Sequence, residues 1–137
     1  LGAQPGKAGG SDIGAYRVAK GILDQGGVVA ILPEGTRSFD GVIGEPKPGV
    51  SLLATRTGTP VLPIGISGTD DLIAREQILP NIGSRITMRV GPLFTLSIAD
   101  GADRRQALAA ADEELMRRIA ALVEPRHRGR WEPWPDG

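Results

Sequence analysis

Val28-Val29-Ala30-Ile31-Leu32 is an uninterrupted apolar run in the first third of the chain. A short, largely β-branched run of this kind is typical of a strand that is buried on both faces of a sheet. Apolar residues recur at helical spacing before it, in a segment that begins at Ser11 or Asp12 and is stopped by Gly26-Gly27. A helix followed directly by a buried strand predicts an α/β fold.

The remaining segments extend this prediction. We expect helices at 48–58 and 102–123 and strands at 61–66 and 85–90. Pro63 implies an edge or a bulge in its strand, because proline lacks a ladder donor. The strand at 85–90 alternates in polarity, so we expect its apolar face to be buried and the strand to lie at the outside of the sheet. Together these elements predict a mostly parallel sheet with flanking helices.

Length and composition limit the class of protein. The chain has 137 residues and no cysteine, and its 16 basic and 16 acidic residues balance. We expect one domain at 1–123 and an irregular Pro/Arg/Trp tail at 124–137. The balanced charge argues against binding to nucleic acid. The missing cysteines fit a reducing compartment, and no apolar run approaches the ~18 residues that span a bilayer.

Most catalytic chemistry also lacks its residues. His127 is the single histidine, so metal binding by several histidines is excluded. The segment Gly65–Thr69 is close to a nucleophile elbow but lacks the final glycine, and Lys47-Pro48-Gly49 is not a nucleotide-binding P-loop. Neither serine hydrolysis nor nucleotide hydrolysis is supported.

The loop at 33–48 contains a combination of residues suited to a phosphate. Arg37 offers a planar guanidinium, Thr36 adds a hydroxyl donor, and Gly35 allows close backbone approach. Glu34 is placed to orient Arg37 or to accept a hydrogen bond from a substrate hydroxyl. The sequence leaves a second interpretation open, in which this is a surface turn with a weak Glu–Arg pair.

Two lysines are further candidate cations. Lys47 stands at the start of the second expected helix, where free backbone N–H groups favour an anion. Lys7 lies in the N-terminal segment. A solvated surface lysine is the alternative for both.

Leu32-Pro33-Glu34-Gly35-Thr36-Arg37-Ser38 resembles the F-P-E-G-T-R-S block of the glycerolipid acyltransferases, in particular the 1-acylglycerol-3-phosphate acyltransferases. Other blocks agree in order. Gly2–Lys7 resembles the preceding G-x-F-P-V-x-R block, Lys47–Ala54 the K-x-G-x-x-x-L-A block, Val61–Ile64 the V-x-P-V block, and Glu124–Trp131 the family's C-terminal ending. The resemblance therefore extends over nearly the whole chain.

The resemblance implies a sheet fold like that of glycerol-3-phosphate acyltransferases and transfer of a fatty acyl group to 1-acylglycerol-3-phosphate (lysophosphatidic acid). The donor is acyl-CoA or acyl carrier protein, the product is phosphatidic acid, and no metal or redox cofactor is required. Arg37 would bind the acceptor's phosphate, Glu34, Gly35 and Thr36 would shape the pocket, and Lys47 would add charge. The implied location is cytoplasmic, at a membrane surface.

Two departures from the family matter. The H-x-x-x-x-D block, which supplies the general base, is absent, and the fifth residue after His127 is Glu132. The family arginine of the first block falls at or beside Ala8, so Lys7 is a doubtful substitute. We therefore expect the C-terminal portion of an acyltransferase, incomplete at its N-terminus and inactive alone. A non-catalytic lipid-phosphate binding module is the alternative.

Two expectations about surfaces follow. An incomplete domain predicts exposed apolar surface along one sheet edge and a tendency to associate. Peripheral membrane contact is expected from the lipid substrates, and the tail offers arginines with Trp131 and Trp134 for it. A tail packed on the domain is the other interpretation.

Overall fold

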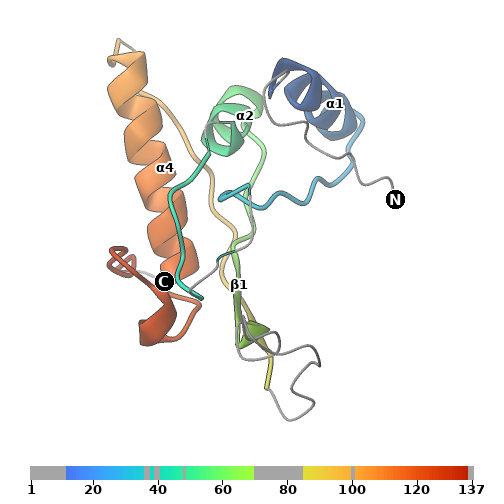
Figure 1. Cartoon of the computed structure of the whole chain (residues 1–137). Coiled ribbons are helices and arrows are strands. Elements are labelled where there is room, and N and C mark those ends of the chain that lie inside the picture. The colour runs from blue at the N-terminus through green and yellow to red at the C-terminus, as the bar shows by residue number, and fades with distance from the viewer. Residues whose placement is uncertain are drawn as a thin grey trace.

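The computed structural model describes residues 12–35, 38, 41–47, 49–69, 85–99 and 101–135. The helices in this part of the chain are α1 (Asp12–Asp24), α2 (Val50–Thr57) and α4 (Arg104–Ala120). Figure 1 shows α1 beside α2, and α2 against the upper half of the long helix α4. All three helices were predicted, and α4 ends three residues before the expected Val123.

Local sequence explains the helix ends. The side chain of Asp103 accepts a hydrogen bond from the backbone N–H of Gln106 at 2.9 Å, which caps α4. Gly58 ends α2 in the left-handed conformation with φ of 64°, a backbone state that glycine adopts without strain. Pro48, the expected start of the second helix, lies outside the described residues.

The core lies between the helices and around the end of α4. Ala54 of α2 packs with Leu96, Ala111 and Leu115 in one cluster. A second cluster joins Met116, Ala120 and Trp131. Because Trp131 belongs to the C-terminal segment, that segment is part of the packed structure.

The sheet consists, within the described residues, of two antiparallel strands. Strand β1 (Ile64–Ser67) pairs with β2 (Thr87–Val90), with Ile64 opposite Val90. An isolated antiparallel bridge between Val61 and Phe94 extends the pairing. The predicted mostly parallel sheet is therefore not observed among the described residues, where β1 and β2 run in opposite directions.

The predicted buried strand at 28–32 is wrong. This segment is extended but belongs to no strand, and Val28 and Leu32 are 92% and 75% exposed. A run of apolar residues is buried as a strand only where neighbouring strands and covering helices enclose it. No described strand pairs with this segment, and most of its side chains are exposed.

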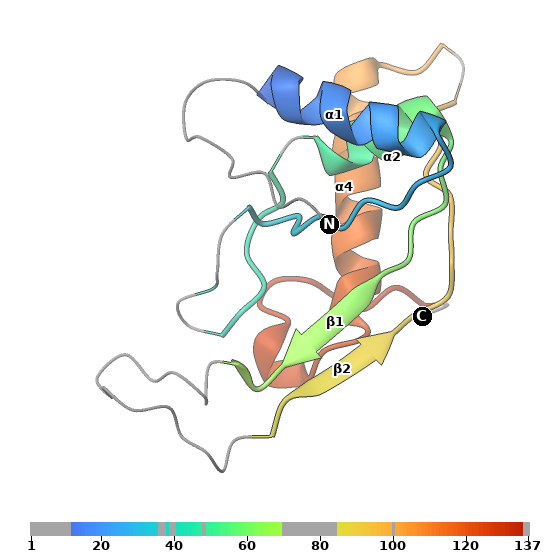
Figure 2. The ribbon, with the colours of Figure 1, turned by 90° about the vertical axis from the view of Figure 1, so that its right-hand side faces the viewer.

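The burial of the strands also differs from the prediction. In β1 only Gly65 and Ser67 are buried, on the face that meets the end of α4 (Figure 2). A Cβ on Gly65 would lie 2.7 Å from the Cβ of Leu122, so glycine permits this close approach. The opposite face carries the exposed side chains Ile64, Ile66, Met88 and Val90, which we call the open sheet face. The expected exposed apolar surface is thus present, on a sheet face and not along an edge.

Of the tail expected at 124–137, residues 124–134 are packed against the domain, and from here on we call these residues the tail. It contains a short 3-10 helix, η1 (Pro125–His127), and Trp131 is 4% exposed. Of the two interpretations left open by the sequence, the packed tail is the one observed. No helix in the described ranges is both long and apolar enough to cross a bilayer.

Candidate functional site

The acyltransferase-like block begins where the extended segment 28–32 turns back on itself. The backbone N–H of Gly35 donates to the carbonyl of Leu32 at 3.0 Å. The backbone N–H of Lys47 donates to the carbonyl of Pro33 at 2.7 Å, which closes the loop between residues 33 and 47. We call residues 33–47 the motif loop. Its two ends are therefore held together by backbone contacts.

Glu34 has a structural partner inside this loop. Its Oε2 accepts a hydrogen bond of 2.7 Å from the backbone N–H of Gly44, ten residues later. A carboxylate that accepts from a backbone N–H makes a stronger bond than a neutral acceptor. This contact fixes the carboxylate near residues 41–45, which we call the far arm of the motif loop. The sequence had not predicted this contact.

Gly35 and Lys47 lie in contact within the motif loop. Gly35 has φ of 67°, and a Cβ on it would lie 2.9 Å from Cγ of Lys47. The Lys47 stem therefore crosses directly over the Gly35 backbone. Lys47 as a whole is exposed, so its ammonium group has access to a solvent ligand.

Three of the predicted site residues, Lys7, Thr36 and Arg37, lie outside the described residues. Glu34, Gly35 and Lys47 lie on one loop, and α2 begins shortly after it at Val50.

His127 is not available as a general base. It is 4% exposed, and its Nδ1 lies 2.6 Å from the carbonyl oxygen of Gly41. A base that removes a substrate proton must reach that proton within hydrogen-bond distance. The buried imidazole instead joins the tail to the motif loop, in keeping with its assignment to the tail.

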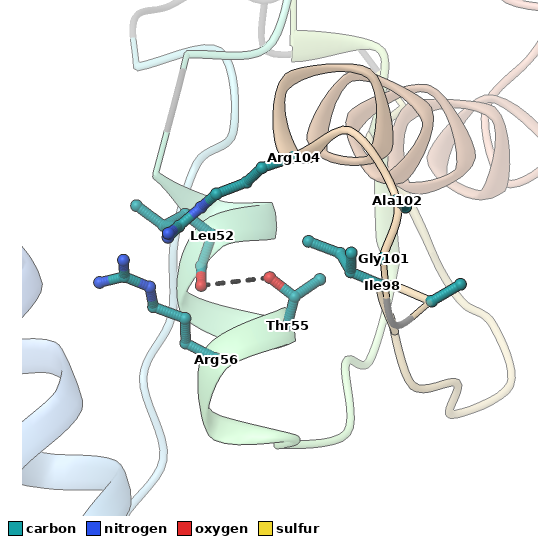
Figure 3. Close-up of a pocket in the computed structure, with 8 residues that line it drawn as sticks. Leu52, Thr55, Arg56, Ile98, Gly101, Ala102 and Arg104 are labelled. Carbon is teal, nitrogen blue, oxygen red and sulfur yellow. Dashed lines mark hydrogen bonds between the residues drawn. The ribbon is translucent and has the colours of Figure 1, made fainter.

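A separate pocket of about 370 Å³ lies between α2 and the segment that leads into α4 (Figure 3). It is lined by Leu52, Thr55, Arg56, Ile98, Ala99, Gly101, Ala102 and Arg104. The Thr55 hydroxyl donates to the Ser51 carbonyl at 2.6 Å, so it is occupied within the helix. None of the predicted site residues lines this pocket.

Comparison with known proteins bears on the motif loop. Residues 7–67 match the family model of the acyltransferases, and this range contains the Leu32–Ser38 block and Lys47. The chain is therefore similar to the acyltransferases over this range, and the predicted resemblance is confirmed.

Two plant proteins are also similar to part of the chain. Over 52 residues it is 42% identical to the chloroplastic 1-acyl-sn-glycerol-3-phosphate acyltransferases BAT2 of Brassica napus and LPAT1 of Arabidopsis thaliana. The similar stretch covers 38% of this chain and 15% of each relative. No solved structure matches the chain.

Proposed function

We propose that the whole protein transfers a fatty acyl group to 1-acylglycerol-3-phosphate, and that this chain binds the phosphate of that acceptor. The product is phosphatidic acid. The observation that carries the proposal is the family match over residues 7–67, which includes the Leu32–Ser38 block. The names of the two relatives describe the same reaction class.

Each residue of the block has a part in this proposal. Arg37 binds the phosphate through its planar fork, which matches two oxygens at once. Lys47 adds a second positive charge, and its stem lies against Gly35 of the block. Glu34 and Thr36 shape the pocket, and Lys7 is a further candidate cation.

Catalysis requires a general base that this sequence does not contain. The base removes the proton of the acceptor hydroxyl, whose oxygen then attacks the thioester carbonyl of acyl-CoA or acyl carrier protein, and the donor thiol leaves. His127 is buried against Gly41 and cannot act in this step. We therefore propose that the chain alone is inactive and that an H-x-x-x-x-D block elsewhere supplies the base. No metal or redox cofactor enters this scheme.

Binding of the acceptor tests the phosphate site. Calorimetry with a short-chain lysophosphatidic acid below its micelle concentration is expected to show binding by the wild-type chain. Arg37→Ala is expected to weaken it at least tenfold, since a charged hydrogen-bonded pair is lost. Arg105→Ala, an exposed arginine of α4, is the control and should bind like wild type. Equal affinity in the Arg37 and wild-type chains contradicts the proposal.

A transfer assay separates the enzyme from a non-catalytic lipid-phosphate binding module. This alternative is favoured by one observation, namely that the single histidine of the sequence is buried. The assay compares this chain with a version extended upstream in its own reading frame. Activity only in the extended version supports the enzyme, and binding without activity in both supports the module. Activity in the shorter chain overturns our account of the base.

We also propose peripheral contact with a membrane surface, on the cytoplasmic side. The support is the chemistry of the proposed substrate, whose acyl chain resides in a bilayer. The two relatives are named as chloroplastic proteins. Trp131 takes no part in this contact, because it is buried in the domain. Sedimentation with liposomes that contain phosphatidic acid is expected to carry the chain into the pellet, and an unbound chain would contradict the proposal.

A further inference from the structure

The tail contacts the far arm of the motif loop, residues 41–45, through several hydrogen bonds and one ion pair. One contact joins backbone groups, from the Ile43 N–H to the His127 carbonyl at 2.8 Å. Three involve side chains of the tail: His127 Nδ1 lies 2.6 Å from the Gly41 carbonyl oxygen, Trp131 Nε1–H donates to the Gly44 carbonyl at 3.1 Å, and Arg130 Nη2 donates to Glu45 Oε2 at 2.6 Å. Two segments far apart in the sequence therefore share one surface (Figure 2).

Gly44 connects the contacts between the tail and the loop to the acyltransferase-like block. Its carbonyl accepts from Trp131, while its N–H donates to the carboxylate of Glu34. A shift of the tail therefore displaces the Gly44 peptide group. This displacement changes the hydrogen bond between the Gly44 N–H and the Glu34 carboxylate. The same arm leads to Lys47, whose stem lies over Gly35.

The tail is a firm support because it is itself anchored in the core. Trp131 packs against Met116 and Ala120 of α4, both fully buried. Arg117 donates to the Glu132 carbonyl at 3.0 Å, and its own carbonyl accepts from the Trp134 N–H at 3.2 Å. The tail therefore fixes the position of the loop relative to α4, the longest described helix.

We infer that the tail is a positioning element of the phosphate site, in which Arg130, Trp131 and His127 hold residues 41–45 of the motif loop in their binding geometry. This inference rests on the proposed function, because it assigns a support to that same site. Positioning residues act through preorganisation, since a ligand then binds without the cost of ordering the loop.

The Arg130–Glu45 pair gives the cleanest test. The two side chains are 62% and 65% exposed, so a change of charge is expected to leave global stability nearly intact. The variants are Arg130→Glu, Glu45→Arg and the double charge exchange. Lys20→Glu breaks an ion pair of α1 with similar exposure, 44% and 54%, away from the loop and is the control.

Two measurements are made on each variant. Amide hydrogen exchange at Ile43, Gly44 and Lys47, whose N–H groups are hydrogen-bonded, reports the order of the loop. Calorimetry with a short-chain lysophosphatidic acid reports the site. Each single variant is expected to exchange faster at these amides and to bind about fivefold more weakly, at an unchanged melting temperature. The double exchange is expected to return both to within twofold of wild type.

The possible failures are distinguishable. Unchanged exchange in both single variants overturns the positioning role of the tail. Faster exchange with unchanged affinity also overturns it, because the loop would then be held without serving the ligand. A wild-type chain that binds no lysophosphatidic acid overturns the proposed function itself, whatever the exchange data show.

Discussion

Trp131 Nε1 donates a hydrogen bond of 3.1 Å to the carbonyl of Gly44, 87 positions earlier in the chain. The indole has two roles at once, because its ring fills the core beside Met116 while its N–H satisfies a loop carbonyl. Tryptophan suits such a position, since it combines a large apolar body with one polar donor.

Trp131→Phe separates these two roles. The phenyl ring keeps most of the core contact, and the donor to Gly44 is lost. We expect a loss of about 1 kcal/mol in the free energy of unfolding, the typical net value of one hydrogen bond. Urea denaturation checks the stability, and faster amide exchange at Gly44 should accompany it. An unchanged exchange rate would show that the N–H contributes nothing to the loop.

Gly35→Ala tests the crossing of Lys47 over the block. Both the left-handed φ of 67° and the 2.9 Å approach to Lys47 Cγ oppose a methyl group there. Gly26→Ala is the matched control, because Gly26 has φ of 76° with nothing within 4 Å of its Cβ position. The control should lose about 1 kcal/mol from backbone strain alone. Gly35→Ala should lose at least as much and also bind lysophosphatidic acid more weakly, and a normal affinity would exclude a role for this contact.

Gly65→Ala tests the contact between β1 and the end of α4. Its new methyl group would meet backbone as well as side-chain atoms of Leu122, at 2.7 to 2.9 Å, so neither element can yield cheaply. We expect a loss of about 2 kcal/mol in unfolding free energy. Gly21→Ala, in the open interior of α1, should instead stabilise by about 0.5–1 kcal/mol. Equal effects in the two variants would refute the close approach.

The Arg130–Glu45 pair predicts a pH dependence. Hydrogen bonds from Arg130 lower the pKa of Glu45 from its ordinary value, and the same bonds raise the pKa of Arg130. Because the folded pKa of Glu45 is the lower one, its contribution is present above the ordinary glutamate pKa and is lost as the pH falls through the folded value. NMR titration should find the pKa of Glu45 lower in wild type than in Arg130→Gln. Identical values would contradict the ion pair.

The open sheet face predicts self-association at high protein concentration. Met88 and Val90 are 63% and 57% exposed, and adjacent apolar side chains in water favour association. Sedimentation velocity should show concentration-dependent species in the wild type and fewer in Met88→Lys. Ile13→Lys, on α1 and 67% exposed, is a control away from the sheet. A wild type that stays monomeric throughout would disprove this expectation.

Local patterns in the sequence were sufficient for the helices. The helical spacing before Gly26, the αL glycine at Gly58 and the capping Asp103 each act within a few residues, so the sequence encodes them directly. The acyltransferase block was equally readable, because its residues are contiguous.

Features that depend on distant partners were not predictable in the same way. Val28–Leu32 has the composition of a buried strand, but burial depends on neighbours that a local pattern does not contain. The direction of β2 relative to β1 likewise follows from pairing and not from alternation. The tail contacts gave one signal in advance, since Glu124–Trp131 resembles a family block, although its partners in the motif loop could not be read from it.

The set of contacts between the tail and the motif loop also has a consequence for the order of folding. These contacts join residues 84 to 87 positions apart, while α1, α2 and α4 form from neighbours in sequence. Distant contacts close last, because the entropy of the intervening chain must be lost before they form. During synthesis the motif loop leaves the ribosome long before His127 and Trp131 exist. The motif loop therefore reaches its observed geometry only after the tail has been synthesised, and a chain that stops after α4 would have its helices but not the finished loop.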